Sequence, residues 1–358
     1  MKAFSCPNCS QLVFFHNSVC LRCSSDLGFD PVQRTVVIPD DTTTPCVNLD
    51  LAACNWLLTS PEEVEEHDGL CLSCRLTRTR PDDDDLDALG AFADAETQKR
   101  RLVFQMLELG LPVAPYDENT DKGLAFDLLS SRFDQVTIGH DDGLITLDLA
   151  ESDDAHREQV RQQMGEAYRT VLGHFRHEIG HYYWDVLIGG DENRTARCRE
   201  LFGDETLDYG DALDQHYQNG PPAAWGEHYV SQYATMHPWE DWAETFAHYL
   251  HIRDALQTAA SFGLQVVGPD IETTAGTGEL TATPTDPSDD DSILDLVADW
   301  LALSYALNAM SRSLGNHDLY PFVLAAAVVD KLRFVHRMVG DGAVALDTTA
   351  SVAGAAAS

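Results

Sequence analysis

The hydrophobic positions of the chain follow a helical period in several long segments. The first is residues 86–109, which contain no proline, carry apolar residues toward their end and are followed by Gly110. Another helical pattern begins near Asp154. Residues 292–313 and 320–338 predict two amphipathic helices near the end of the chain. These segments predict a mainly helical protein.

Two short segments alternate with a period of two and predict strands. Residues 135–140 and 144–149 flank Asp-Asp-Gly at 141–143, which is a turn sequence, so we expect a β-hairpin. Residues 273–291 are rich in Thr, Gly, Pro and Asp and predict a mobile loop. From Gly340 the composition turns to Gly, Ala, Ser and Thr, which favours a disordered tail. Helices with a small sheet give an α+β fold class.

The helical pattern that begins near Asp154, with an interruption expected near Gly165 or Gly173, leads into a His-Glu-x-x-His sequence. Residues four apart share a helix face, so His177 and His181 can direct both imidazoles at one metal ion. Glu178 projects beside that ion, where it can take a proton from a bound water. The alternative is a surface helix with two unrelated histidines, but the bulky apolar residues that follow favour a buried active-site helix.

A catalytic zinc site needs a third protein ligand and one open position. The metzincin pattern requires glycine three residues and histidine or aspartate six residues after the second histidine. Trp184 and Leu187 occupy these positions, which excludes that class. Asp185 lies one turn after His181, and a straight helix can hardly supply three consecutive turns to one ion. We therefore expect Asp185 to orient a ligand or to make a helix-end contact.

Residues 236–251 are the remaining region that can supply the third ligand. Pro238 suits the first turn of a new helix, whose apolar face is expected to pack in the core. Glu240 and Glu244 are four apart on this helix, and a buried carboxylate needs a partner. One can bind zinc while the other orients a zinc-bound histidine. Three further histidines nearby are interpreted as satisfied or exposed residues, with binding of substrate as the alternative: His237, His248 and His251.

Eight of the nine cysteines fall within the first 74 residues, which favours metal binding over disulfide bonds in a protein expected to be cytosolic. Two CxxC pairs, separated by ten residues, predict a closed tetrahedral zinc site. Its ligands would be Cys6, Cys9, Cys20 and Cys23. A second, less regular set predicts a second site of the same kind. Its ligands would be Cys46, Cys54, Cys71 and Cys74.

Sites with four thiolates are structural, because they leave no open position for chemistry. The alternative for Cys46 and Cys54 is that they are small buried hydrophobic residues, and Cys198 is expected to be a structural thiol. After Cys74, residues 75–85 change from basic to acidic, which predicts a linker.

The chain has 358 residues and a formal net charge of -36, and four of its 23 basic residues are lysines. Nucleic acid is therefore excluded as a partner, because its phosphates would be repelled. The sequence has no apolar run of about 18 residues and no apolar core of a signal peptide near Met1. We expect a cytoplasmic protein with no membrane partner.

Residues 177–185 and 240–251, behind N-terminal cysteine pairs, resemble a bacterial family of zinc-binding metallopeptidases with a zinc-ribbon domain. This resemblance implies a peptidase but no particular substrate. Residues 240–246 are also similar to the helix that carries the ligand glutamate of anthrax lethal factor. That similarity implies that Glu240 binds zinc and that Glu244 contacts a ligand. It further implies that Tyr233 donates a hydrogen bond to the oxyanion, with Tyr229 as the alternative.

Together these features predict a zinc-ribbon module over residues 1–80, a mainly helical zincin-like metallopeptidase domain with a small β-sheet over 81–340 and a flexible tail over 341–358. The predicted function is a bacterial zinc peptidase of the gluzincin type, with one catalytic and two structural zinc ions. A peptide or protein is its substrate, and the zinc ribbon can dock a protein partner. The alternatives are a non-catalytic zinc scaffold and a hydrolase of a non-peptide amide.

Overall fold

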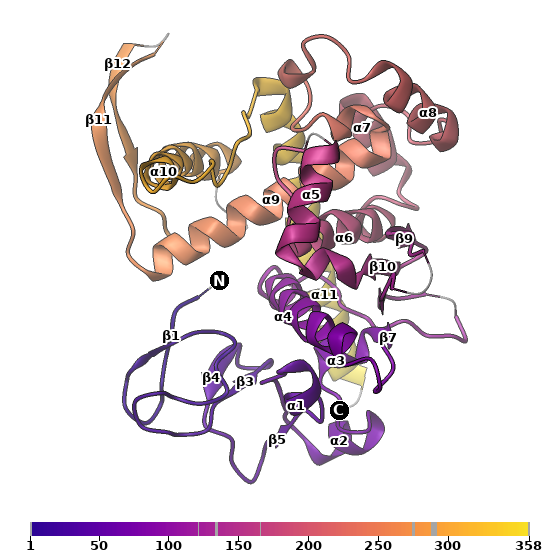
Figure 1. Ribbon diagram of the computed structural model, residues 1–358, viewed down its shortest axis with the longest axis vertical. Helices are drawn as coiled ribbons and strands as arrows, with labels where there is room; N and C mark the ends of the chain where they lie inside the picture. The colour runs from indigo at the N-terminus through magenta and orange to yellow at the C-terminus, as the bar shows by residue number, and fades with distance from the viewer. Residues whose placement is uncertain are drawn as a thin grey trace. The chain divides into compact units, whose positions relative to one another are not determined.

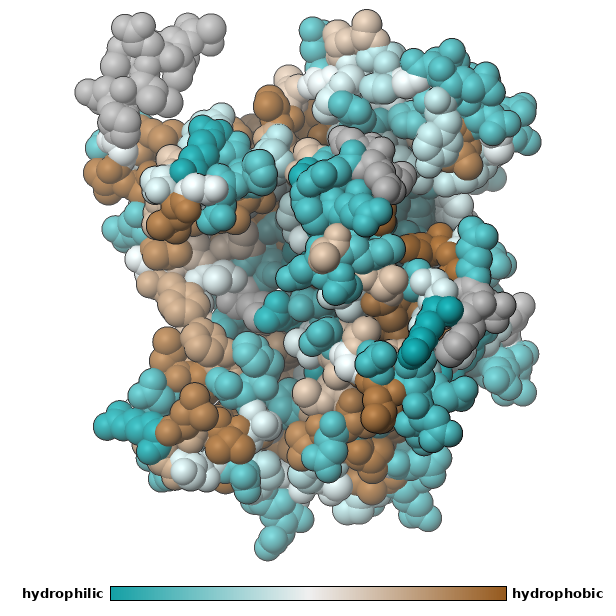
Figure 2. Space-filling view, viewed as in Figure 1, coloured by the Kyte–Doolittle hydropathy of each residue, from teal (hydrophilic) through white to brown (hydrophobic). Residues whose placement is uncertain are grey.

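The computed structural model describes residues 2–120, 122–132, 135–164, 166–273, 276–287 and 292–356, and it confirms the α+β class. The chain forms two compact units, Met1–Tyr182 and Tyr183–Ser358. Figure 1 shows the course of the chain, and Figure 2 shows hydrophilic residues over much of the visible face, with hydrophobic patches between them. The extent of the three predicted domains stays a prediction.

The first unit begins with short antiparallel strand pairs. The pairs are β1 (Phe4–Ser5) with β2 (Leu12–Val13), β3 (Gly28–Asp30) with β4 (Thr35–Val37), and β5 (Thr44–Pro45) with β6 (Leu57–Leu58). The short helices α1 (Leu49–Ala52), α2 (Pro61–Glu66) and α3 (Leu72–Arg75) complete this region.

A small aromatic core holds these pairs together. The ring centroid of Phe29 lies 4.9 Å from Phe15 and 5.0 Å from Trp56, and all three side chains are buried. Phe104 joins them from a helix, with its centroid 5.4 Å from that of Phe29. Edge-to-face aromatic pairs of this kind add roughly 0.5–1.5 kcal/mol each beyond the area that they bury.

The helix that carries Phe104 is α4 (Leu86–Glu108), which confirms the helix predicted for residues 86–109. Asp85 caps its first turn, because its side chain accepts a hydrogen bond from the Ala88 N–H. Gly110 follows with φ +63, as expected for a glycine just beyond a helix end. In Figure 1, α4 lies beside α3 and α1.

One strand before α4 and three strands after it form a four-stranded sheet with the order β7-β8-β10-β9. β8 (Ala125–Leu129) runs parallel to β7 (Thr77–Thr79) and to β10 (Leu144–Asp148), and β9 (Gly139–Asp141) pairs antiparallel with β10. The predicted hairpin is therefore confirmed, although its first strand is shorter than expected.

The expected linker after Cys74 is partly wrong, because residues 77–79 form β7. The threonines of this segment favour a strand. The intervening Arg78 forms an ion pair with Asp127 of β8, with Nη2 2.5 Å from Oδ2, so its charge is matched within the sheet.

Two helices end the first unit. A 3₁₀ turn at Leu149–Ser152 precedes α5 (Asp154–Met164), and α6 (Val171–Leu187) carries the His-Glu-x-x-His sequence. The predicted interruption falls between them; Gly165 lies outside the described residues, and Gly173 is inside α6. Arg176 of α6 is buried, and its Nε donates to Oε1 of the buried Gln105 on α4 at 3.1 Å.

The second unit contains α7 (Glu192–Phe202), α8 (Tyr209–Asn219), 3₁₀ turns at Trp225–Glu227 and Tyr233–Thr235, and the long helix α9 (Pro238–Ser261). As predicted, Pro238 opens α9. His237 is its N-cap, and its Nδ1 accepts a hydrogen bond from the Trp239 N–H at 3.1 Å.

The end of the chain departs from the sequence-based expectations. β11 (Val266–Thr273) pairs antiparallel with β12 (Gly276–Ala282), so the first part of the loop expected over 273–291 is strand, and Figure 1 shows this pair beside α10 (Ile293–Ser313). Residues 274–275 and 288–291 of the expected loop lie outside the described residues. The β-branched residues of both segments explain the pairing. The helix predicted from residue 320 starts later, as α11 (Ala326–Ala356). α11 is helical across most of 341–358; the flexibility of this segment stays a prediction.

Among the described residues, α10 is the one helix long and apolar enough to cross a membrane, by length and composition alone. A core helix of a water-soluble protein can have the same length and composition, so this single helix is weak evidence for a membrane span. The predictions of a cytoplasmic location and of no membrane partner stay predictions.

A buried ion pair joins α9 to α11. Lys331 Nζ lies 2.5 Å from Asp241 Oδ2, and it also donates to the His228 carbonyl at 2.8 Å. The ammonium lies 4.4 Å from the centroid of the Tyr229 ring, a cation–π distance. Because both charged side chains are withdrawn from water, neither can lose its partner without a large desolvation cost.

We expect Lys331→Met to destabilise the second unit by about 3–5 kcal/mol, because the substitution leaves the Asp241 carboxyl buried without its cation. The exposed pair Arg333–Asp330 on the same helix provides the control, and Arg333→Met should cost less than about 1 kcal/mol. The free energy of unfolding is measured by urea denaturation. Equal losses for the two variants would contradict the account.

Candidate metal centres

The first cysteine set forms a compact cluster, as predicted. All four sulfurs lie within 4.8 Å of one another, with Cys6 and Cys23 at 3.6 Å and Cys9 and Cys20 at 3.7 Å. Ser10 and Ser24 follow the two CxxC pairs and have positive φ values of 58° and 59°. Their N–H groups donate to the carbonyls of Cys6 and Cys20, which closes a tight turn at each pair. Four thiols in this arrangement fit a tetrahedral zinc ion.

The electrostatics of this cluster differ between its thiols. Hydrogen bonds from the Ser25 side chain and backbone lower the pKa of Cys23 to about 6. Burial and hydrogen bonds with the other three thiols raise the pKa of Cys9 to about 12. Since the thiolate is the form that binds a metal, Cys23 is the thiol best prepared for zinc at neutral pH.

The second cysteine set also comes together, although Cys46 and Cys54 are not part of a CxxC pair. All four sulfurs lie within 4.8 Å and all four residues are buried. Cys54 and Cys71 are 3.6 Å apart, and the Cys71 N–H donates to the Cys46 sulfur at 3.4 Å. Contacts with the other three thiols lower the pKa of Cys46. The interpretation of Cys46 and Cys54 as ordinary hydrophobic residues is therefore wrong.

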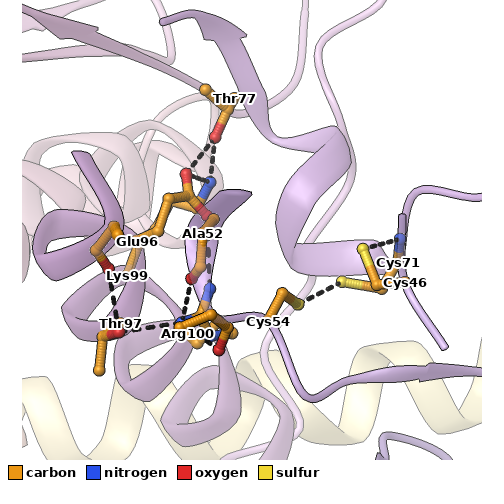
Figure 3. A network of polar contacts seen from close by, with 11 residues as sticks. Cys46, Ala52, Cys54, Cys71, Thr77, Glu96, Thr97, Lys99 and Arg100 are labelled. Atoms are coloured by element: carbon orange, nitrogen blue, oxygen red, sulfur yellow. Dashed lines mark hydrogen bonds and ion pairs between the residues drawn. The ribbon is translucent and has the colours of Figure 1, made fainter. Parts of the chain in front are cut away.

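Buried cations of α4 lie next to this second cluster (Figure 3). Lys99 Nζ contacts Thr77 Oγ1 and lies 2.6 Å from Glu96 Oε1, and all these groups except the threonine are fully buried. Arg100 is also buried, and its Nη2 donates to the carbonyls of Ala52 and Ala53 at 2.8 and 3.1 Å.

The charges of this region require an anion besides Glu96, because one carboxylate cannot balance two buried cations. Four thiolates around one divalent ion carry a net charge of about -2. The positive charge of Lys99 helps to lower the pKa of the Cys74 thiol. A metal-loaded cluster would therefore complete the charge balance of α4. Cys198 lies outside both clusters, and burial raises the pKa of its thiol to about 12, as expected for a structural thiol.

In the first unit, α6 places the two motif histidines as predicted. The ring centroids of His177 and His181 are 5.0 Å apart at 80°, so their nitrogens can face a common point. His181 is buried, and His177 and Glu178 are half-buried. Asp185, one turn further on, is exposed, and its predicted role in orienting a ligand stays a prediction.

A third histidine, which the sequence analysis missed, lies against this pair. The ring of His140 on β9 stacks on His181 with centroids 5.9 Å apart. Its Nε2 accepts the Gly143 N–H at 2.9 Å. Burial lowers the pKa of His140 to about 4, and the nearby His181 also lowers it, so His140 is neutral at pH 7. The hairpin turn requires glycine at position 143, since a Cβ there would lie 2.0 Å from the Gly123 carbonyl oxygen.

In the second unit, Glu240 is buried in the first turn of α9 and Glu244 is half-buried one turn later. The Tyr209 hydroxyl donates to Glu240 Oε1 at 3.0 Å. Of the two tyrosines that the sequence suggested, Tyr233 has its ring 6.3 Å from that of His216, and Tyr229 packs against Lys331. Tyr209 was missed because no local motif surrounds it.

The additional histidines of this region are largely satisfied, as the sequence favoured. His237 caps α9, and His248 Nδ1 lies 2.7 Å from the Tyr320 hydroxyl. His251 is half-buried, with its ring 6.0 Å from that of His248. That Glu240 serves the same ion as the histidines stays a prediction.

Comparison with known proteins matches most of the chain. A family model described as "Putative zinc-binding metallo-peptidase" matches residues 88–338, and a zinc-ribbon domain model matches residues 3–85. Relatives from Mycobacterium bovis and Mycobacterium tuberculosis, each named an uncharacterized protein, are 52% identical over 343 residues. These alignments cover 95% of this chain and 96% of each relative. No solved structure matches the chain.

We expect Cys71→Ser to remove one zinc ion per chain and to lower the melting temperature, because it breaks the cluster that balances Lys99 and Arg100. Cys198→Ser is the matched control and should keep the zinc content. Zinc is counted by inductively coupled plasma mass spectrometry, and melting is followed by calorimetry. An unchanged zinc count in the Cys71 variant would show that the second cluster does not hold the metal.

Proposed function

Because the chain belongs to the family of zinc-binding metallopeptidases with an N-terminal zinc ribbon, we propose that it hydrolyses peptide bonds at a third zinc site, with Glu178 as general base. The observation that carries this proposal is the geometry of α6. His177 and His181 turn their rings toward each other at 5.0 Å, and Glu178 follows the first of them on the same helix.

The proposed ligands are His177, His181 and Glu240, the ligand set of a gluzincin. Each can offer a metal one ligand atom, a ring nitrogen or a carboxylate oxygen. Two nitrogens and one carboxylate oxygen are a common donor set for catalytic zinc, and they leave one position open. Glu244 and Asp185 are proposed to orient ligands rather than to bind the ion.

A zinc ion in this site would lower the pKa of a bound water to about 7 and polarise the scissile carbonyl. The Glu178 carboxylate takes the proton of the attacking water and then returns a proton to the nitrogen of the leaving amine. Tyr233, assigned from the similarity to lethal factor, is proposed to donate a hydrogen bond to the developing oxyanion.

The sheet of the first unit supports a peptide as substrate. β9 is the last strand in the order β7-β8-β10-β9, and its other edge can pair with an extended peptide. This edge lies close to the motif helix, because His140 of β9 stacks on His181. Main-chain hydrogen bonds to β9 would then hold the scissile bond near the motif.

The two cysteine clusters are proposed to hold structural zinc, which gives two structural ions and one catalytic ion per chain. Four thiolates around each ion leave no position for substrate. The zinc-ribbon module is also proposed to dock a protein partner, and the protein to work in the cytoplasm of a bacterium.

Replacement of Glu178 tests the proposed chemistry. Glu178→Gln removes the base but keeps a side chain of the same size, so we expect three zinc ions to remain and peptide hydrolysis to fall about 10²–10⁴-fold. Glu65→Gln on the exposed side of α2 is the control and should leave both unchanged.

Cleavage of a diverse peptide library is followed by mass spectrometry. Hydrolysis by the Glu178 variant at the rate of the unaltered protein would contradict the mechanism.

A further inference from the structure

We propose that Tyr209 is a positioning residue of the catalytic metal site: its hydroxyl donates to Glu240 Oε1 and orients this carboxylate for the ion. The inference rests on the proposed function, because it takes Glu240 as the third ligand. The inference adds Tyr209 of α8, which belongs to no sequence motif, to the residues of the proposed metal site.

The contact between the two side chains is direct. The Tyr209 hydroxyl donates to Glu240 Oε1 at 3.0 Å, and the glutamate side chain is buried. A buried carboxylate is costly unless donors satisfy it, and a hydrogen bond to an ionised acceptor is stronger than one between neutral groups. The phenol therefore satisfies one oxygen of the buried carboxylate and restricts the orientation of the Glu240 side chain.

The backbone that carries Tyr209 is fixed to the start of α9. His237 Nδ1 accepts the Trp239 N–H, and its Nε2 donates to the Leu207 carbonyl at 3.1 Å. The ring of Tyr209 also packs on that of His237, with centroids 5.4 Å apart. One histidine thus caps the helix that presents Glu240 and also fixes the segment that presents the phenol.

The start of α8 is ordered independently of this contact. The Asp208 side chain accepts a hydrogen bond from the Asp211 N–H at 2.8 Å and caps the helix. The Tyr209 side chain is 39% exposed, so removal of its hydroxyl leaves no cavity in the core. The effect of such a change should therefore appear at the metal and not in the stability of the fold.

Loss of a residue that orients a metal ligand typically costs 10–100-fold in metal affinity or activity. A carboxylate without its phenol partner can rotate or present both oxygens to the ion, and the ligand geometry becomes less well defined. Since the ion acts on the reacting carbonyl, the chemical step should slow while the binding of a peptide along β9 should not change.

The test is Tyr209→Phe, which removes the oxygen and keeps the ring. We expect the variant to lose one of its three zinc ions to a chelator at a 10–100-fold lower chelator concentration. Its kcat should fall by a similar factor with KM unchanged, and its melting temperature should match that of the unaltered protein. Tyr217→Phe, on the same helix with a 66% exposed side chain, is the matched control and should behave as the unaltered protein does.

Glu240→Ala separates failure of this inference from failure of the proposed function. Loss of one zinc ion in the Glu240 variant, together with unaltered zinc retention and kcat in Tyr209→Phe, would overturn the role of Tyr209 and leave the function intact. Retention of all three ions by Glu240→Ala would instead overturn the ligand set on which both depend. A fall in melting temperature without a change in zinc affinity would reduce Tyr209 to a structural contact.

Discussion

One helix can give a metal ion two imidazoles a turn apart, but it cannot also give the third ligand, and this constraint shapes the account of the protein. α6 supplies His177 and His181, with Glu178 between them. The remaining ligand must come from another element that presents a buried carboxylate. Glu240 in the first turn of α9 has these properties, and α9 starts there because His237 and Pro238 form a helix N-terminus.

The motif helix is also tied to the zinc-ribbon region through α4. On the motif helix, Arg176 next to His177 donates to Gln105 of α4. Lys99 and Arg100 of α4 lie beside the second cysteine cluster (Figure 3). The same helix thus contacts both the motif helix and the second cysteine cluster. Under the proposal of structural zinc, the thiolates of this cluster would supply the negative charge that lets α4 bury two cations.

Much of this arrangement could be predicted from local sequence. Regular CxxC spacing predicts the first cysteine cluster, and the turn at 141–143 between alternating segments predicts the β9–β10 hairpin. These features depend on residues close together in the chain, so propensity and spacing decide them. The second cluster was predicted from one CxxC pair, Cys71 and Cys74, together with two further cysteines that form no such pair, Cys46 and Cys54.

Long-range pairing explains what the sequence did not predict. β7 was taken for a linker because its partner strand β8 lies far along the chain, and the same strand supplies Asp127, the ion-pair partner of Arg78. His140 and Tyr209 belong to no sequence motif. Each is recognised as a candidate site residue only through its contact, His140 with His181 and Tyr209 with Glu240. Sites of this kind need the fold before they can be recognised.

The central claim is that two imidazoles and one carboxylate share an ion that keeps a position for solvent. Anomalous diffraction at the zinc edge from crystals of the zinc-loaded protein measures this directly. The account predicts a third zinc peak about 2.0–2.2 Å from a nitrogen of His177, a nitrogen of His181 and an oxygen of Glu240, with a water completing the tetrahedron. A third ion enclosed by four protein side chains, or no zinc at these histidines, would contradict it.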